Sequence, residues 1–281
     1  MLPEYQVRFH TWVDSWGVGV DRVVETASAV IAFGHRNHQP VVLKIVKRPG
    51  DEWHSGRACD AFAGRGVVRA IEHADGAILL ERLVPGTPLV TEVRDDFRAT
   101  AIIADVIQRM SPAQAPDTAP TVASCADAFD RYLAENTGHI PNSVVREAQR
   151  TYLQLAASQG TMRLLHGDLH HYNVLLDEHR GWLAIDPKGV VGERAYELGA
   201  ALRNPVERPD VFAVPATIEQ RVSHFSRTFA IDAERILRWA FAQAVLAALW
   251  ELEDNGVLTA GHGWLSLAKA IALIQGRRPH D

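Results

Sequence analysis

The sequence contains few cysteines and no hydrophobic run long enough for a membrane helix. Cys59 and Cys125 are its only cysteines, and because they form no close-spaced pair, they indicate neither a disulfide framework nor a cysteine-based zinc site. The longest uncharged run near the end of the chain, residues 239–250, is too short to span a bilayer. Residues 1–10 lack the apolar stretch of a signal peptide. We therefore expect a cytoplasmic protein that does not bind membranes.

The chain also lacks an excess of basic residues. It has 29 Lys and Arg against 34 Asp and Glu, which gives a formal net charge of −5. Because nucleic-acid binding needs clustered Lys and Arg for the phosphate contacts, this balance argues against a nucleic-acid partner. A mildly acidic protein suits a cationic small molecule instead. We expect such a molecule as the partner of a monomer or weak dimer.

The most informative pattern is a set of three polar residues with fixed spacing. Asp168 is followed five positions later by Asn173, and Asp186 ends an apolar run further on. Phosphoryl transfer to a hydroxyl needs a carboxylate that orients the acceptor, together with hard oxygen ligands for Mg²⁺. The spacing predicts Asp168 as the catalytic base and Asn173 and Asp186 as metal ligands, brought together by a hairpin of residues 174–176 and 182–185.

The same segment has a rival interpretation as a zinc site. His166, Asp168, His170 and His171 are all possible ligands of such an ion. Helical zinc motifs place two histidines one turn apart, whereas Gly167 and the irregular polarity indicate a loop. We therefore favour the phosphotransferase and keep a zinc hydrolase as the weaker alternative.

A strand upstream carries the lysine that a kinase needs. Residues 40–47 form an apolar run in which Lys44 lies among aliphatic neighbours, and Lys47 is the alternative at its end. A lysine in this position binds the nucleotide phosphates in kinases. Glu52, near the start of a stretch with helical spacing, is the predicted ion-pair partner of Lys44. Two earlier strands are joined by a short polar turn, in which Ser28 is available as a hydroxyl donor to a phosphate.

A hinge is expected where the strand at 77–83 runs into Pro85-Gly86. Backbone groups near Glu81 and Leu83 would pair with adenine. The hinge divides the chain into an N-terminal nucleotide-binding lobe, 1–84, and a C-terminal lobe with the catalytic loop and acceptor site, 85–281. Apolar residues at three- and four-residue spacing predict helices in the second lobe. These helices cover residues 97–110, 125–135, 143–158, 218–229 and 233–253.

Several segments carry a resemblance to a known family. They are residues 64–69, 165–173, 180–187 with 189–193, 225–227 and 231–237. These segments resemble the aminoglycoside and hydroxyurea phosphotransferases, and within that family the streptomycin 6-phosphotransferases. The resemblance implies an α+β, two-lobed, protein-kinase-like fold, with a small antiparallel β lobe containing one helix and a larger, mainly α-helical lobe. It also implies ATP and Mg²⁺ as cofactors, streptomycin phosphorylated at position 6 as the product, and antibiotic resistance as the role.

The acceptor is expected to contact carboxylates and an aromatic face of the helical lobe, because it is predicted to be cationic. Trp250, Glu251 and Asp254 end a long helix, and Glu193 follows the catalytic segment, so these four are the candidate acceptor residues. Two alternative functions stay open. One is a kinase of the same fold for hydroxyurea, a sugar or another small metabolite, and the other is a nucleotide-binding protein without transfer activity.

Overall fold

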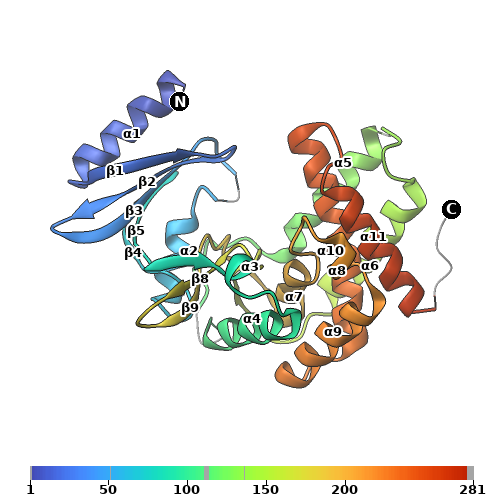
Figure 1. Cartoon of the computed structure of the whole chain (residues 1–281). Coiled ribbons are helices and arrows are strands. Elements are labelled where there is room, and N and C mark those ends of the chain that lie inside the picture. Colours follow the sequence, from blue (N-terminus) through green and yellow to red (C-terminus); the bar gives the residue numbers. More distant parts are fainter. Residues whose placement is uncertain (1, 51, 111–113, 136, 277–281) are drawn as a thin grey trace.

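An antiparallel sheet forms the N-terminal part of the computed structural model, which describes residues 2–50, 52–110, 114–135 and 137–276 (Figure 1). Its strands are β1 (Gly19–Glu25), β2 (Ala29–Arg36), β3 (Gln39–Val46), β4 (Ala70–Ala74) and β5 (Ala77–Glu81), in the spatial order β1-β2-β3-β5-β4. The strands predicted at 40–47 and 77–83 and the two earlier strands are confirmed. Before β4, Val67 makes an isolated bridge to Ala184.

The alternation of side chains along β3 decides which face of the sheet is core and which is functional. Leu43 and Ile45 are fully buried on one face, as expected for residues two positions apart in a strand. They pack with Tyr5 and Phe9 of helix α1 (Pro3–Ser15), which covers this face in Figure 1 and was not anticipated. Lys44 points to the opposite face, towards the second lobe.

The opposite face of the sheet meets helix α2 (Ser55–Phe62), whose Cys59 and Phe62 are buried in the main core of the molecule. After β5, the chain enters β6 (Pro85–Pro88), which leaves the five-stranded sheet and pairs with β8 (Val174–Asp177). The predicted hinge therefore coincides with the point at which the chain changes sheets.

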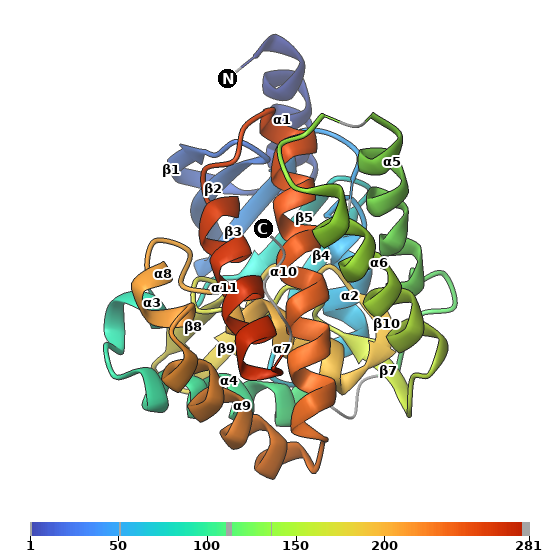
Figure 2. The ribbon, with the colours of Figure 1, turned by 90° about the vertical axis from the view of Figure 1, so that its right-hand side faces the viewer.

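The second lobe is built around helix α10 (Ala233–Asn255), which packs against α5, α6, α7, α9 and α11 (Figure 2). This helix is buried on nearly all sides between residues 236 and 249, as an apolar helix without a polar face must be. None of the described helices is long and apolar enough to cross a membrane. The surrounding helices are α3 (Leu89–Glu92), α4 (Asp96–Met110), η1 (Val122–Ala126), α5 (Asp127–Glu135), α6 (Asn142–Ala157), α7 (Arg194–Leu202), α8 (Pro209–Phe212), α9 (Pro215–Phe229) and α11 (Gly261–Ile274).

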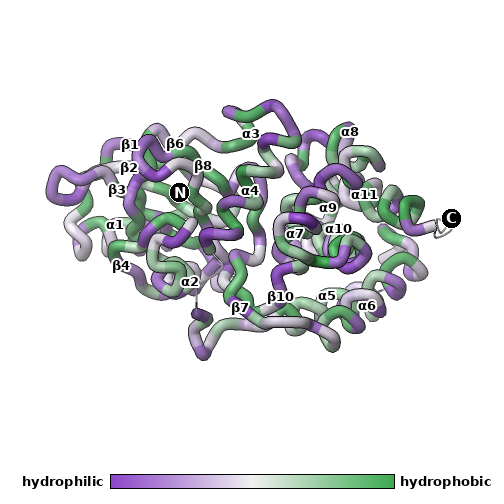
Figure 3. The backbone as a smooth tube through the Cα atoms, turned by 90° about the horizontal axis from the view of Figure 1, so that it is seen from below, coloured by the Kyte–Doolittle hydropathy of each residue, from purple (hydrophilic) through white to green (hydrophobic). Residues whose placement is uncertain are grey.

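Two small sheets lie between the lobes. Strand β7 (Met162–Leu165) pairs with β10 (Val190–Glu193), and β8 forms a hairpin with β9 (Gly181–Ala184). Figure 3 shows hydrophilic segments on peripheral loops, such as the tip that joins β2 and β3, and hydrophilic and hydrophobic residues alternating along many of the helices. The α+β class with a β lobe and a helical lobe is confirmed, as are the five predicted helices, whose observed ends differ by a few residues.

Candidate active site

The β8–β9 hairpin brings the two predicted metal ligands together. Val174 pairs with Ala184 in the ladder, and the amide of Ile185 donates to the carbonyl of Asn173 at 2.9 Å. Asn173 therefore lies just before the first strand of the hairpin, close to Asp186, which lies just after the second strand. Asp186 has a φ of +57°, a left-handed conformation that Asp tolerates better than most residues. The predicted hairpin is present.

Lys44 lies between two carboxylates from different parts of the chain. Its Nζ is 2.8 Å from Oε2 of Glu52 and 2.9 Å from Oδ1 of Asp186, and the side chain is only 5% exposed. Burial disfavours the ammonium, but the two carboxylates outweigh this effect and raise the pKa of Lys44. The lysine is therefore a permanent cation that links the β lobe to the hairpin. Glu52 lies in the turn before α2 rather than within a helix.

Asp168 is surrounded by two basic side chains and the ring of a histidine. Its Oδ1 accepts a hydrogen bond from Nη2 of Arg203 at 2.8 Å, while Nε2 of His170 and Nζ of Lys188 lie 3.7 and 3.9 Å from its Oδ2. Burial alone would raise the pKa of Asp168, but Lys188, His170 and Arg203 hold it well below its usual range. Asp168 is therefore an ionised carboxylate, which is the form that a proton acceptor requires.

The loop that carries Asp168 is held from both sides by buried groups. Both oxygens of Glu197 in α7 accept backbone hydrogen bonds, from His166 at 2.6 Å and from Gly167 at 3.1 Å. The ring of His166 accepts from the amide of Asp168 and, through Nε2, bonds the carbonyl of Ile185 at 2.7 Å. Burial lowers the pKa of His166 to about 4, so the ring is neutral and ties the loop to the hairpin.

The donor set of the hairpin fits Mg²⁺ and does not fit zinc. Nδ2 of Asn173 donates to the carbonyl of Asp168 at 3.0 Å, which leaves its side-chain oxygen as a hard ligand beside the carboxylate of Asp186. The zinc interpretation is wrong. Within the described ranges no three His, Cys, Asp or Glu side chains converge, and both ring nitrogens of His166 are already bonded.

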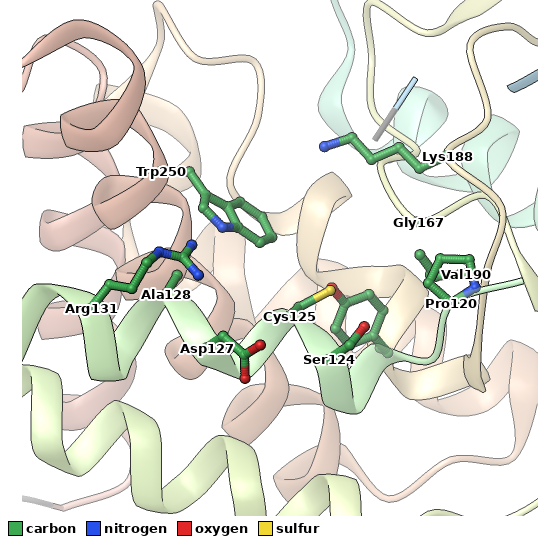
Figure 4. A pocket seen from close by; sticks show the side chains of 11 residues that line it. Pro120, Ser124, Cys125, Asp127, Ala128, Arg131, Gly167, Lys188, Val190 and Trp250 are labelled. Carbon is green, nitrogen blue, oxygen red and sulfur yellow. The ribbon is translucent and has the colours of Figure 1, made fainter. Parts of the chain in front are cut away.

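A pocket of about 200 Å³ opens beside the loop of Asp168 (Figure 4). Trp250 and Lys188 lie over one part of it, and Ser124 in η1 and Asp127 at the start of α5 line the opposite part. The pocket shares Lys188, Trp250 and Arg131 with a wider cavity of about 780 Å³ between the lobes. The wider cavity is also lined by Glu52, the partner of Lys44, so an acceptor in the pocket would be open to the side of the cleft where Glu52 lies.

Two of the predicted acceptor residues have other roles. Glu193 is buried, and its Oε1 accepts hydrogen bonds from Arg235 at 2.7 Å and Trp239 at 2.5 Å, so it joins the core rather than a pocket. The oxygens of Glu251 accept from the amides of Ala260 and Gly261 at the start of α11. Both predictions are wrong, because these carboxylates are already used by backbone and core donors.

The other predicted residues lie at different edges of the cleft. Trp250 lines both cavities, and Ser28 and Asp254 line the wider one. The side chain of Glu81 is bonded to the amide of Arg69 and to Arg180, and Leu83 is buried at the start of the hinge. Neither side chain is free for a nucleotide, so the hinge hypothesis depends on the backbone.

Several residues at the site were not found from the sequence. Arg203, the residue after α7, supports the loop of Asp168, and Asp127 lines the acceptor pocket. Neither of them belongs to a short motif. Lys188 follows the predicted metal ligand Asp186 by two positions, and this closeness in sequence was the feature that could have marked it as a site residue.

Comparison with known proteins identifies relatives over most of the chain. A family model described as aminoglycoside/hydroxyurea antibiotic resistance kinase matches residues 18–255. Streptomycin 3''-kinase from Klebsiella pneumoniae is 32% identical over 242 residues, which cover 83% of this chain and 88% of that protein. Hydroxyurea phosphotransferase from Kitasatospora aureofaciens is 33% identical over 236 residues, covering 77% and 67%. Streptomycin 6-kinase from Streptomyces glaucescens is 30% identical over 281 residues, covering 95% and 87%.

The fold is also similar to that of a solved structure. A thermostable mutant of aminoglycoside phosphotransferase APH(4)-Ia, in ternary complex with ADP and hygromycin B, matches with a TM-score of 0.62. The match covers 93% of this chain and 97% of that one, at 14% sequence identity. An identity this low shows the shared fold and nothing about the ligands of this chain.

Proposed function

The chain belongs to the family of aminoglycoside and hydroxyurea antibiotic resistance kinases, and we propose that it transfers the γ-phosphoryl group of ATP, with Mg²⁺, to the hydroxyl at position 6 of streptomycin. The family that the motifs predict is correct, and the chain is a phosphotransferase with an alcohol group as acceptor. The observation that carries the proposal is that Lys44, Asp186, Asn173 and Asp168 lie together. They are linked by the ion pair of Lys44 with Asp186, by the hydrogen bond from Asn173 to the carbonyl of Asp168, and by the bond from the amide of Ile185 to the carbonyl of Asn173.

Each of these residues has a distinct role in the proposed reaction. Lys44, fixed by Glu52, binds the α- and β-phosphates, and the oxygens of Asn173 and Asp186 hold Mg²⁺. The bound metal ion would neutralise charge on the phosphates and align them for transfer. Asp168 accepts a hydrogen bond from the acceptor hydroxyl, orients it, and takes its proton.

The acceptor site proposed for streptomycin is the pocket beside Asp168. Asp127 on its wall and Asp254 at its wider mouth supply negative charge for a cationic acceptor, and the indole of Trp250 supplies an aromatic face. ATP as phosphoryl donor is supported by the family, whose relatives are named kinases, and by the lysine that lies beside the proposed metal ligand Asp186. Antibiotic resistance is the role that this activity would serve.

A second candidate acceptor is hydroxyurea. The pocket has a volume of about 200 Å³, which is smaller than the roughly 300–1,000 Å³ of most sites for drug-sized ligands. A relative that is 33% identical is named hydroxyurea phosphotransferase. A small acceptor could therefore be enclosed without the wider cavity, whereas streptomycin must extend into it.

The proposal is tested by measuring ADP release with Mg²⁺-ATP and a panel of acceptors. The panel contains streptomycin, other aminoglycosides, hydroxyurea and simple sugars, and we expect the highest kcat/KM with streptomycin. NMR of the product identifies the phosphorylated hydroxyl. A higher kcat/KM with hydroxyurea would favour the second candidate. Nucleotide binding without turnover on any acceptor would favour a protein that has lost transfer activity.

A further inference from the structure

Lys188 lies where the cavities of the cleft meet. It lines the acceptor pocket of about 200 Å³, the wider cavity of about 780 Å³, and a small cavity of about 60 Å³ beside the start of α2. Its ammonium lies 3.9 Å from Oδ2 of Asp168 and 5.4 Å from the centre of the Trp250 ring. Figure 4 shows its side chain extending over the pocket. A cation therefore stands between the proposed base and the acceptor site.

The backbone of Lys188 is fixed by the catalytic loop. Its amide donates to the carbonyl of His166 at 2.8 Å, and the amide of Gly189 bonds the same carbonyl at 3.2 Å. The side chain is 23% exposed, so its end can reach an occupant of the cleft. Lys188 is thus anchored at its main chain and accessible at its charged end.

The other cations near the reacting groups are committed elsewhere. Lys44 is held by Glu52 and Asp186 on the metal side of the cleft. Arg203 is 9% exposed and bonds Asp168 and, at 3.5 Å, Gln243 in the core. Among the described cations that neighbour Asp168 or Asp186, Lys188 is therefore the one that faces both the base and the acceptor pocket.

A phosphoryl group in transit requires a cation at this position. It carries negative charge on its outer oxygens and passes close to Asp168, which is itself ionised. A fixed ammonium beside both groups reduces their repulsion and stabilises the charge that spreads over the oxygens in the transition state.

Resting on the proposed function, we infer that Lys188 is a catalytic residue that contacts the transferring phosphoryl group from the acceptor side. The acceptor oxygen forms a bond to the γ-phosphorus while the bond from that phosphorus to the bridging oxygen breaks, and its electron pair remains on ADP. The proton of the acceptor hydroxyl passes to Asp168. Lys188 keeps its own proton and exchanges its contact with Asp168 for one with a phosphoryl oxygen.

The test compares Lys188→Met and Lys188→Arg with Lys269→Met, which removes an exposed cation from α11. Calorimetry measures the binding of ADP and of AMP-PNP, which differ in the γ-phosphoryl position. We expect Lys188→Met to bind ADP within about twofold of wild type but AMP-PNP about tenfold to a hundredfold more weakly, because a charge-assisted contact is lost. Its kcat should fall by about 10²-fold or more, at a similar KM for the acceptor, and the arginine variant should recover part of the lost kcat.

Equal loss of ADP and AMP-PNP binding would overturn the inference, since it would assign Lys188 a structural role. An unchanged kcat would do the same. Should the methionine variant not fold, Lys188→Gln serves for the same comparison. If wild type releases no ADP with any acceptor, the proposed function fails separately, and the difference between AMP-PNP and ADP still tests the contact of Lys188.

Discussion

The carboxylate of Asp168 accepts a hydrogen bond of 2.8 Å from the guanidinium of Arg203, a buried residue that follows the last residue of α7. The two residues are 35 positions apart, and the arginine also bonds Gln243 of the central helix α10. The proposed base is therefore oriented by the core of the helical lobe as well as by its own loop. This arrangement keeps one carboxylate oxygen bonded while the other faces Lys188 and the cleft.

Replacing Arg203 with methionine should raise the pKa of Asp168, because one of the cations that lowers it is removed. The acidic limb of kcat/KM should then move to higher pH, since the base becomes protonated earlier as pH falls. The lost charge-assisted bond should also cost about 1.5–3 kcal/mol of unfolding free energy. A pH–rate profile and denaturant unfolding measure the two effects. Arg208→Met, which breaks an exposed pair with Asp210, is the control and should leave the limb in place.

The sequence predicts the metal hairpin because every interaction that builds it is local. Asn173 and Asp186 flank two short strands joined by a tight turn, so a strand pattern and a turn are sufficient to bring them together. Lys44 and Glu52 are also close in sequence, on either side of one connection. Local pattern and turn chemistry therefore account for the half of the site that is proposed to bind nucleotide and metal.

The supporting half of the site depends on long-range packing that a single sequence does not reveal. Glu197 and Arg203 reach the catalytic loop only because α7 packs between that loop and α10. The same limit explains the errors at Glu193 and Glu251, since their sequence gives no sign that distant amides and side chains occupy both carboxylates. A carboxylate near a motif can be judged as a substrate ligand only when the structure shows whether other groups of the protein already donate hydrogen bonds to it.

Removing the carboxylate of Asp168 should separate catalysis from nucleotide binding. In Asp168→Ala, transfer should fall by about 10²- to 10⁴-fold, the usual contribution of a general base. Nucleotide affinity should change little, because Lys44 and the hairpin ligands are untouched. ADP-release assays and calorimetry measure the two quantities. Full turnover by this variant would show that the assigned role is wrong.

Asp186→Ala should impair nucleotide binding as well as turnover. The variant loses a proposed Mg²⁺ ligand and one of the two carboxylates that hold Lys44. We expect the affinity for Mg²⁺-ADP to drop about tenfold or more, as for the loss of a charged contact. Glu178→Ala removes an exposed carboxylate from the turn of the same hairpin and should leave affinity unchanged. Similar titration curves for both variants would contradict the metal role.

Trp250 and Glu251 are neighbours in sequence with different expected effects. Trp250→Ala should raise the KM for a cationic acceptor by about three- to thirtyfold through loss of an aromatic face. Glu251→Ala should leave that KM in place and lower the unfolding free energy by about 0.5–2 kcal/mol, because the start of α11 loses a cap. Acceptor kinetics and thermal unfolding of the two variants distinguish these effects. An equal rise in the acceptor KM of both variants would show that Glu251 also contacts the acceptor.

Glu197 should make the stability of the catalytic loop depend on pH in a defined direction. Burial raises its pKa from 4.5 to about 7, against the opposing effect of the amides of His166 and Gly167. Between these values the folded state holds a proton that the unfolded state has lost, so the contribution of Glu197 to stability is fully present below pH 4.5 and is lost as pH rises through 7. The unfolding free energy of wild type relative to Glu197→Gln should therefore fall by about 3 kcal/mol across this window. Denaturant unfolding of both proteins at several pH values measures the difference, in which the other titrating groups cancel. A difference between wild type and Glu197→Gln that does not vary with pH would contradict the prediction.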